Sequence, residues 1–175
     1  IKQTIKTQLI PILIAIGIRI LPEQPNESVS LLCTCLSFAT DPKKIGPKAA
    51  SDVISQFYPP DIFKCFAQIV VSPPNQPAID ALRIVTVLSR CSHQWGSCYH
   101  QIVENIQNFI LAILADPNIL NEPERTLEIQ NLLRKINPEY KAHPFDSIIE
   151  FLYQFTQTVL SNSPLQLTII YPGIL

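Results

Sequence analysis

Glycine and charge are scarce in this chain, and each shortage excludes a class of function. Only four glycines occur in 175 residues, and they are far apart. No glycine-rich loop is therefore available to bind a phosphate group. Charged residues make up 15% of the sequence and the net charge is −1, whereas average proteins carry about 25% charged residues. Without a block of basic residues, the sequence predicts no nucleic-acid partner.

Methionine is absent, even at position 1. The opening residues IKQTIKTQLI already show structural patterning, and they contain no charged leader with a cleavage site. We therefore expect residues 1–175 to be a fragment of a longer chain. Five cysteines are an odd number and too few for a secreted disulfide scaffold. The predicted location is intracellular, either cytoplasmic or nuclear.

Long hydrophobic runs are also missing. The longest is LIPILIAIGI at 9–18, which Arg19 ends. A membrane-spanning helix needs about 20 apolar residues, so this run is too short to cross a bilayer. We predict a buried core helix, and the alternative is a helix that dips into a membrane surface.

Proline, in contrast, is abundant, with 16 in the chain, about 9% against a typical 5%. All but Pro11 lie between segments of helical periodicity, as expected for a residue that opens helices and breaks their interiors. The segment 1–20 fits a helix kinked at Pro11, although its isoleucines also alternate as in a strand. The strand-like residues 167–172 have no evident partner. The other predicted helices cover 27–39 with Asn26 as N-cap, 47–57, 60–71, 77–90, 98–114, 122–136 and 146–160.

Apolar residues, 47% of the chain, form stripes along these segments. In 60–71 a common face carries Ile62, Phe66, Ile69 and Val70, while Lys64 and Gln68 point away. The longer stripe in 98–114 contains Ile102, Val103, Ile106, Phe109, Ile110 and Ile113. Each helix is therefore expected to bury one side, which predicts an all-α fold.

The ends of alternate helices are similar in sequence: FATDP (38–42), VVSPP (70–74), LADP (114–117) and LSNSP (160–164). Two helix starts, near 77 and 122, are 45 residues apart. Over about 26–163 the chain resembles an armadillo/HEAT-type α-solenoid, whose helix-pair repeats have about this length. The resemblance implies that residues 1–175 form a single armadillo-like helical domain of antiparallel helix pairs stacked as a right-handed superhelix. An irregular helical bundle is the alternative fold.

The resemblance also implies a function. Such arrays bind other proteins on extended surfaces, so we expect a non-catalytic scaffold or adaptor domain, such as part of a transport receptor or large assembly. Its partners would be other proteins and adjoining repeats of the same chain, with no cofactor. The candidate protein-binding residues lie on polar helix faces and are Arg83, Arg90, Gln154 and Gln157. A helical subdomain of a larger enzyme is an alternative.

One stretch, CSHQWGSCYH at 91–100, contains the side-chain types that bind zinc. Zinc ligands usually come in pairs separated by two to four residues, whereas each pair here has one intervening residue. In a helix over 98–114, Cys98 and His100 would diverge by about 160°. We interpret the stretch as a structural turn at Trp95-Gly96. The alternative is a helical domain with a zinc site at Cys91, His93, Cys98 and His100.

The remaining reactive side chains have structural interpretations, and no catalytic residue is predicted. Cys33, Cys35 and Cys65 lie in apolar helices, where cysteine acts as a small hydrophobe. The carboxylates of the segment 122–136 gather near its start, which suits the positive end of the helix dipole. They are Glu122, Glu124 and Glu128.

Overall fold

The computed structural model describes residues 2–39, 47–90, 99–116, 118–119 and 121–135. All regular structure in these residues is helical, which confirms the all-α prediction. The predicted helix 146–160 and the strand-like residues 167–172 lie outside the described residues. The helices are α1 (Lys2–Ile20), α2 (Pro25–Ala39), α4 (Pro47–Ile54), η1 (Ser55–Phe57), α5 (Pro60–Val71), α6 (Asn75–Arg90), α7 (Tyr99–Leu114) and α8 (Pro123–Lys135).

Prolines mark the helix starts, as predicted. Pro47 opens α4, Pro60 opens α5 and Pro123 opens α8. At the first position of a helix, proline has a suitable fixed φ and lacks only an N–H that would have no partner in the helix. Two predicted helix starts differ from the observed ones. Helix α2 begins at Pro25, so Asn26 lies in the first turn instead of capping it, and α6 begins two residues before Pro77.

The segment with two interpretations is a helix, α1, and it contains Pro11 in its interior. Ile10, Ile14 and Leu21 are buried at helical spacing, which explains the strand-like alternation as apolar residues on every side of a helix. The expected burial is only partly found, because Leu9, Ile12 and Ile16 are exposed. No helix within the described residues is long and apolar enough to span a membrane.

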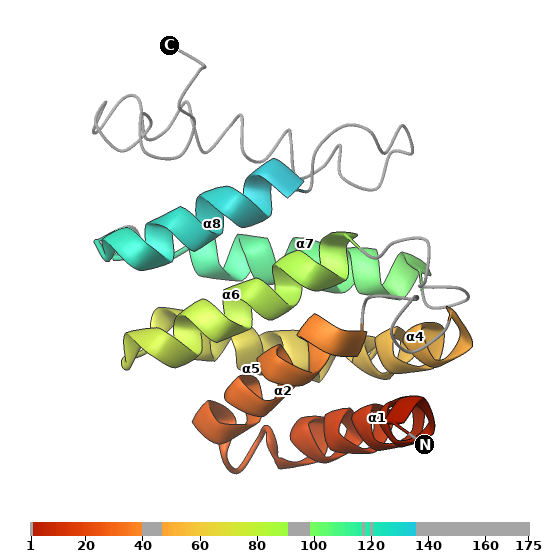
Figure 1. Cartoon of the computed structure of the whole chain (residues 1–175). Coiled ribbons are helices and arrows are strands. Elements are labelled where there is room, and N and C mark those ends of the chain that lie inside the picture. The colour runs from red at the N-terminus through yellow and green to blue at the C-terminus, as the bar shows by residue number, and fades with distance from the viewer. Residues whose placement is uncertain (1, 40–46, 91–98, 117, 120, 136–175) are drawn as a thin grey trace.

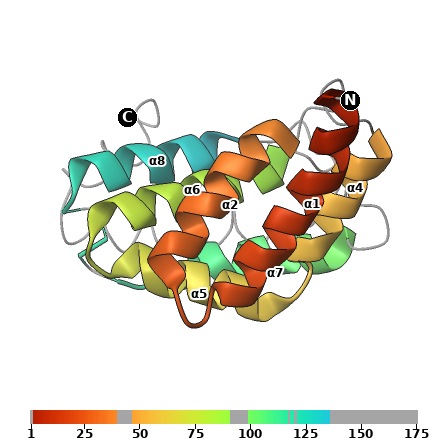
Figure 2. The ribbon, with the colours of Figure 1, turned by 60° about the horizontal axis from the view of Figure 1, so that its bottom comes forward.

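The helices are arranged in two rows (Figures 1 and 2). In one row α2 packs beside α6, and α6 packs beside α8. In the other row α5 packs beside α7, and α5 also contacts α6 across the core. Helix α1 lies mainly against α2 and also touches α4. Consecutive helices thus alternate between the rows from α5 to α8.

The predicted apolar stripes face the space between the rows. In α5 the residues Ile62, Phe66, Ile69 and Val70 are buried, whereas Lys64 and Gln68 are exposed. All six stripe residues of α7 are buried as well. Asn105 of α7 is a buried polar side chain, and it donates from Nδ2 to the Tyr58 carbonyl oxygen at 2.7 Å, which joins α7 to the end of η1.

Helices α1 and α2 approach closely at Gly17. A Cβ at this position would lie 2.7 Å from Cδ2 of the fully buried Leu32. The buried Ser28 hydroxyl donates to the Gly17 carbonyl oxygen at 2.7 Å. Glycine normally weakens a helix interior, but here its missing side chain is what allows the two helices to meet.

Candidate protein-binding surface

Arg83, one of the predicted binding residues, joins α6 to α8. Its Nε donates to Oε1 of Glu128 at 2.9 Å. The Arg83 side chain remains 52% exposed, whereas that of Glu128 is 15% exposed. Glu128 therefore has a partner in a neighbouring helix, which its interpretation as a helix-dipole carboxylate did not include. The guanidinium is held in place by one helix and still open to solvent.

A second polar contact joins the starts of the same two helices. Asn75 donates from Nδ2 to Oε2 of Glu124 at 3.3 Å, and its Oδ1 accepts from Nε of the buried Arg125 at 3.4 Å. One amide thus bridges a carboxylate and a guanidinium on α8. Together with the Arg83–Glu128 pair, it fixes how far α8 can slide along α6.

The face around Arg83 extends to α2, and we call Cys33, Asp80, Arg83 and Glu128 the three-helix face. Burial raises the pKa of the Cys33 thiol, and the Asp80 carboxylate raises it further, while Arg83 opposes this and Glu128 adds to it. Burial is also the first cause of the raised pKa values of Cys35 and Cys65. Nucleophilic and metal-binding cysteines are thiolates. These thiols are instead held protonated.

The other predicted binding residue in the described part of the chain is Arg90. It is exposed in the last turn of α6, where a cation also suits the negative end of the helix dipole. Gln154 and Gln157 lie outside the described residues. The structure thus places two of the four predicted residues on one helix.

The zinc hypothesis falls mostly on residues that are not described. Cys91, His93 and Cys98 lie outside the described residues, and of His100 only the backbone is described, in the first turn of α7. Elsewhere in the described residues, no group of three or more His, Cys, Asp or Glu side chains could hold a metal ion.

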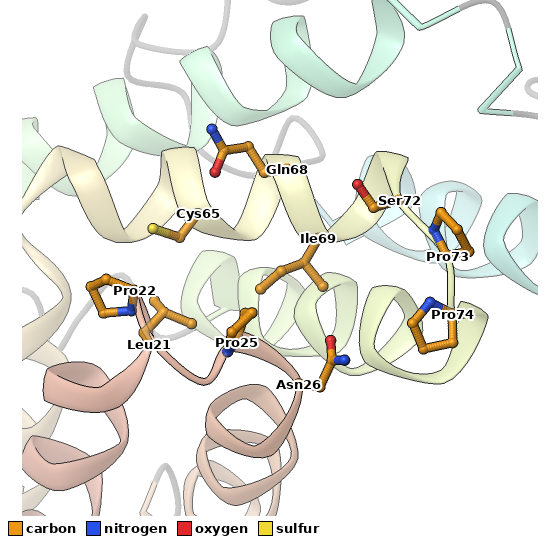
Figure 3. A pocket seen from close by; sticks show the side chains of 10 residues that line it. All are labelled: Leu21, Pro22, Pro25, Asn26, Cys65, Gln68, Ile69, Ser72, Pro73 and Pro74. Atoms are coloured by element: carbon orange, nitrogen blue, oxygen red, sulfur yellow. The ribbon is translucent and has the colours of Figure 1, made fainter.

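A pocket that the sequence did not predict lies where two proline-containing corners meet (Figure 3). One corner is the α1–α2 turn, and the other is the end of α5 with the turn that follows it. The cavity has a volume of about 300 Å³ and is open to solvent on one side. We call it the corner pocket; its lining residues are Leu21, Pro22, Pro25, Asn26, Cys65, Gln68, Ile69, Ser72, Pro73 and Pro74.

The lining combines rigid apolar walls with a few polar groups. Figure 3 shows Pro73 and Pro74 at one side of the pocket, Pro22 toward the other, and Ile69 and Asn26 between them. The amides of Asn26 and Gln68, the Ser72 hydroxyl and the Cys65 thiol supply hydrogen-bonding groups, and no lining side chain carries a formal charge at neutral pH. The prolines of the two corners lie in LPEQPN (21–26) and VVSPP (70–74), and neither segment indicates that the corners meet.

Comparisons of the chain with protein-family models, curated proteins and solved structures find no match. The function must therefore be argued from the geometry of the chain itself.

Proposed function

We propose that this chain is a protein-binding scaffold or adaptor domain without catalytic activity, built as an armadillo/HEAT-type array of helix pairs. The observation that carries this proposal is the side-by-side row of α2, α6 and α8. The starts of these helices at Pro25, Asn75 and Pro123 are 50 and then 48 residues apart. Polar side chains of α6 and α8 are also paired at separations of 45, 49 and 50 residues. Residues about one helix pair apart in sequence thus lie side by side on α6 and α8, which agrees with the neighbour contacts of stacked repeats.

The outer side of this row supports a binding role for two reasons. It is continuous across three helices, so a partner can contact residues far apart in sequence. It also combines exposed cations, Arg83 and Arg90, with the 55% exposed side chain of Leu127 on α8. Arginine and a large apolar side chain on one surface are a common composition of protein interfaces.

Affinity capture with two matched variants tests this function. One variant combines Arg90→Ser with Leu127→Glu on the outer side of the row. The control combines Lys64→Ser with Asn108→Glu on α5 and α7, in the other row. Each variant removes one exposed cation and adds one carboxylate, and all four positions are exposed. Proteins captured from extract of the source cells are quantified by mass spectrometry, and the strongest are purified for calorimetry.

The proposal predicts a set of proteins that binds the wild type and the control but not the row variant, with direct binding of at least one purified member. If both variants retain the same proteins, or no purified protein binds directly, the proposed function is wrong for this surface.

A further inference from the structure

The corner pocket lies apart from the residues on the outer side of the helix row that carry the proposed function. Its volume of about 300 Å³ lies at the lower end of the range of about 300–1,000 Å³ found for small-molecule pockets. It can therefore hold one ring-sized group rather than a nucleotide or a large cofactor. A second, open concavity along α2 is lined by Asn26, Glu27, Ser30, Leu31 and Thr34, and Asn26 lines both. A chain entering the pocket can thus continue along α2.

The pocket walls are preorganised. Proline loses almost no side-chain entropy when it is fixed in place, and four of the ten lining residues are prolines. Ile69, at the centre of Figure 3, is buried in the core from which α5 presents it. Binding a ligand would therefore cost little conformational entropy in the pocket walls, which favours affinity.

The lining selects against charged ligands. Burial, and to a lesser extent the Asp61 carboxylate, raises the pKa of Cys65, so this thiol is neutral. A charged group that left water for this pocket would lose hydration without gaining an opposite charge from a lining side chain. The polar groups offered are amides and a hydroxyl, which suit a peptide backbone or a ring N–H.

Two features of the walls favour an aromatic ring over an aliphatic group. Proline rings and aromatic side chains are established partners, as in the recognition of proline-rich peptides by aromatic grooves. Here the protein would supply the prolines and the partner the ring. Sulfur also makes favourable contacts with aromatic rings, and the Cys65 sulfur lies on the Pro22 side of the pocket (Figure 3).

We propose that the corner pocket binds an aromatic side chain presented by a protein partner, with Asn26, Gln68 and Ser72 hydrogen-bonding the backbone beside it and the flanking chain lying along α2. This inference rests on the proposed function, since it names the class of residue that a bound protein would insert.

N-acetyl-tryptophan amide is the probe for a direct test on the whole chain. Binding is followed by protection of Cys65 from N-ethylmaleimide, measured by peptide mapping, with Cys33 as an internal reference because it does not line the pocket. The amides of N-acetyl-leucine and N-acetyl-glutamate are compared at equal concentration. We expect saturable protection of Cys65 by the tryptophan amide, with a dissociation constant about tenfold or more lower than that of the other two amides.

Two variants show whether the pocket is responsible. Ser72→Trp fills it from an exposed position, and Ser37→Trp places the same ring at an exposed position on α2 outside it. Tryptophan-amide binding, followed by saturation-transfer NMR, should be lost in Ser72→Trp and unchanged in Ser37→Trp. Equal protection by the leucine amide, no saturable protection by any amide, or binding that survives in Ser72→Trp would each overturn the proposal.

The same variants separate this inference from the proposed function. If Ser72→Trp keeps every captured protein that the row variant loses, and the amide does not bind, the scaffold function stands and the pocket assignment is wrong. If the amide binds as expected but no protein is captured, the scaffold function is wrong and the assignment of the ring to a protein partner fails with it, whereas the preference of the pocket for an aromatic ring stands.

Discussion

Helix α2 and helix α8 are both attached to the structure by a helix–helix contact, but the two contacts have different chemistry. The α1–α2 contact is uncharged and depends on shape: Gly17 leaves room for the buried Leu32, and its hydrogen bond with Ser28 is buried. The α6–α8 contact carries the Arg83–Glu128 pair and the Asn75 bridge at its edge. One contact is closed to water, whereas the other keeps a half-exposed cation.

The two contacts therefore contribute differently, one mainly to the stability of the fold and the other mainly to the alignment of two helices. Packing against a buried leucine is worth several kcal/mol, whereas partly exposed ion pairs are worth about 0–1 kcal/mol. We infer that the polar pairs mainly fix the register of α8 on α6. They can do so while leaving polar groups available to a partner. The predictions below test this separation, beginning with the largest expected effect.

The α1–α2 contact should lose the most stability when Leu32 is truncated. Leu32→Ala leaves a cavity under Gly17, and we expect the free energy of unfolding to fall by about 2–5 kcal/mol. Urea denaturation followed by circular dichroism measures it. Leu127→Ala truncates an exposed leucine and should change stability by less than about 0.5 kcal/mol. Similar losses in both variants would contradict the assignment of Leu32 to the core.

Gly17→Ala tests the same contact from α1, and the sign of the change in the free energy of unfolding is diagnostic. Alanine would favour the helix by about 1 kcal/mol if space allowed, but its Cβ would lie 2.7 Å from Leu32. We expect a net loss of about 1–2 kcal/mol from overpacking. In a Leu32→Ala background the same change should stabilise the protein, because the methyl group then enters the cavity.

Ala15→Gly at an exposed position of α1 is the control for helix propensity when Gly17→Ala is compared in the two backgrounds. It should cost about 1 kcal/mol in either background. If Gly17→Ala stabilises the otherwise unchanged protein, the close approach of α1 and α2 is wrong.

Ser28→Ala should have a smaller effect. It removes the buried hydroxyl that donates to the Gly17 carbonyl oxygen at 2.7 Å, and we expect a loss of about 1 kcal/mol in the free energy of unfolding. Ser30→Ala on the exposed side of α2 should be neutral within about 0.5 kcal/mol. Two equal, negligible effects would mean that the hydroxyl adds nothing to this contact.

Most helices could be predicted because proline acts locally. A proline fixes its own φ and favours the first turn of a helix over its interior, so Pro60 indicated the start of α5 and VVSPP its end without any tertiary information. The two wrong starts, near Asn26 and Pro77, have the same origin. Several residues within one turn can satisfy the first N–H groups, and a sequence does not choose between them.

The contacts between helices were harder to predict because they depend on which helices are neighbours. Arg83 and Glu128 are 45 residues apart, the spacing already visible in the helix starts near 77 and 122. Aligning equivalent positions at that spacing would have found the pair. The corner pocket had no such signal, since nothing local indicates that the α1–α2 turn meets the end of α5.

The Arg83–Glu128 pair should contribute little to stability. A double-mutant cycle with Arg83→Ala and Glu128→Gln should give a coupling energy of about 0.2–1 kcal/mol. The coupling should weaken as salt is raised, because half of the Arg83 side chain is exposed. A coupling above about 2 kcal/mol, or one insensitive to salt, would place this pair among the main stabilising contacts and remove the distinction from the α1–α2 contact.

The pKa of the Cys33 thiol responds to the charges of Arg83 and Glu128. Its pKa in the folded chain is raised above the ordinary value of 9.0, so the unfolded chain loses this proton first as pH rises. The contribution of Cys33 to the free energy of unfolding is therefore intact below pH 9.0 and is lost as the pH rises through the pKa of the folded chain. Cys33→Ala should lose less stability over that range than the unchanged chain.

Within the folded state, Arg83→Ala should raise the pKa of Cys33 further and Glu128→Gln should lower it, because the guanidinium favours the thiolate and the carboxylate disfavours it. The pH dependence of Cys33 alkylation, measured by peptide mapping with Cys35 as reference, checks both directions. Shifts of the same sign in the two variants would mean that Cys33 senses a change in packing and not the charges of the three-helix face.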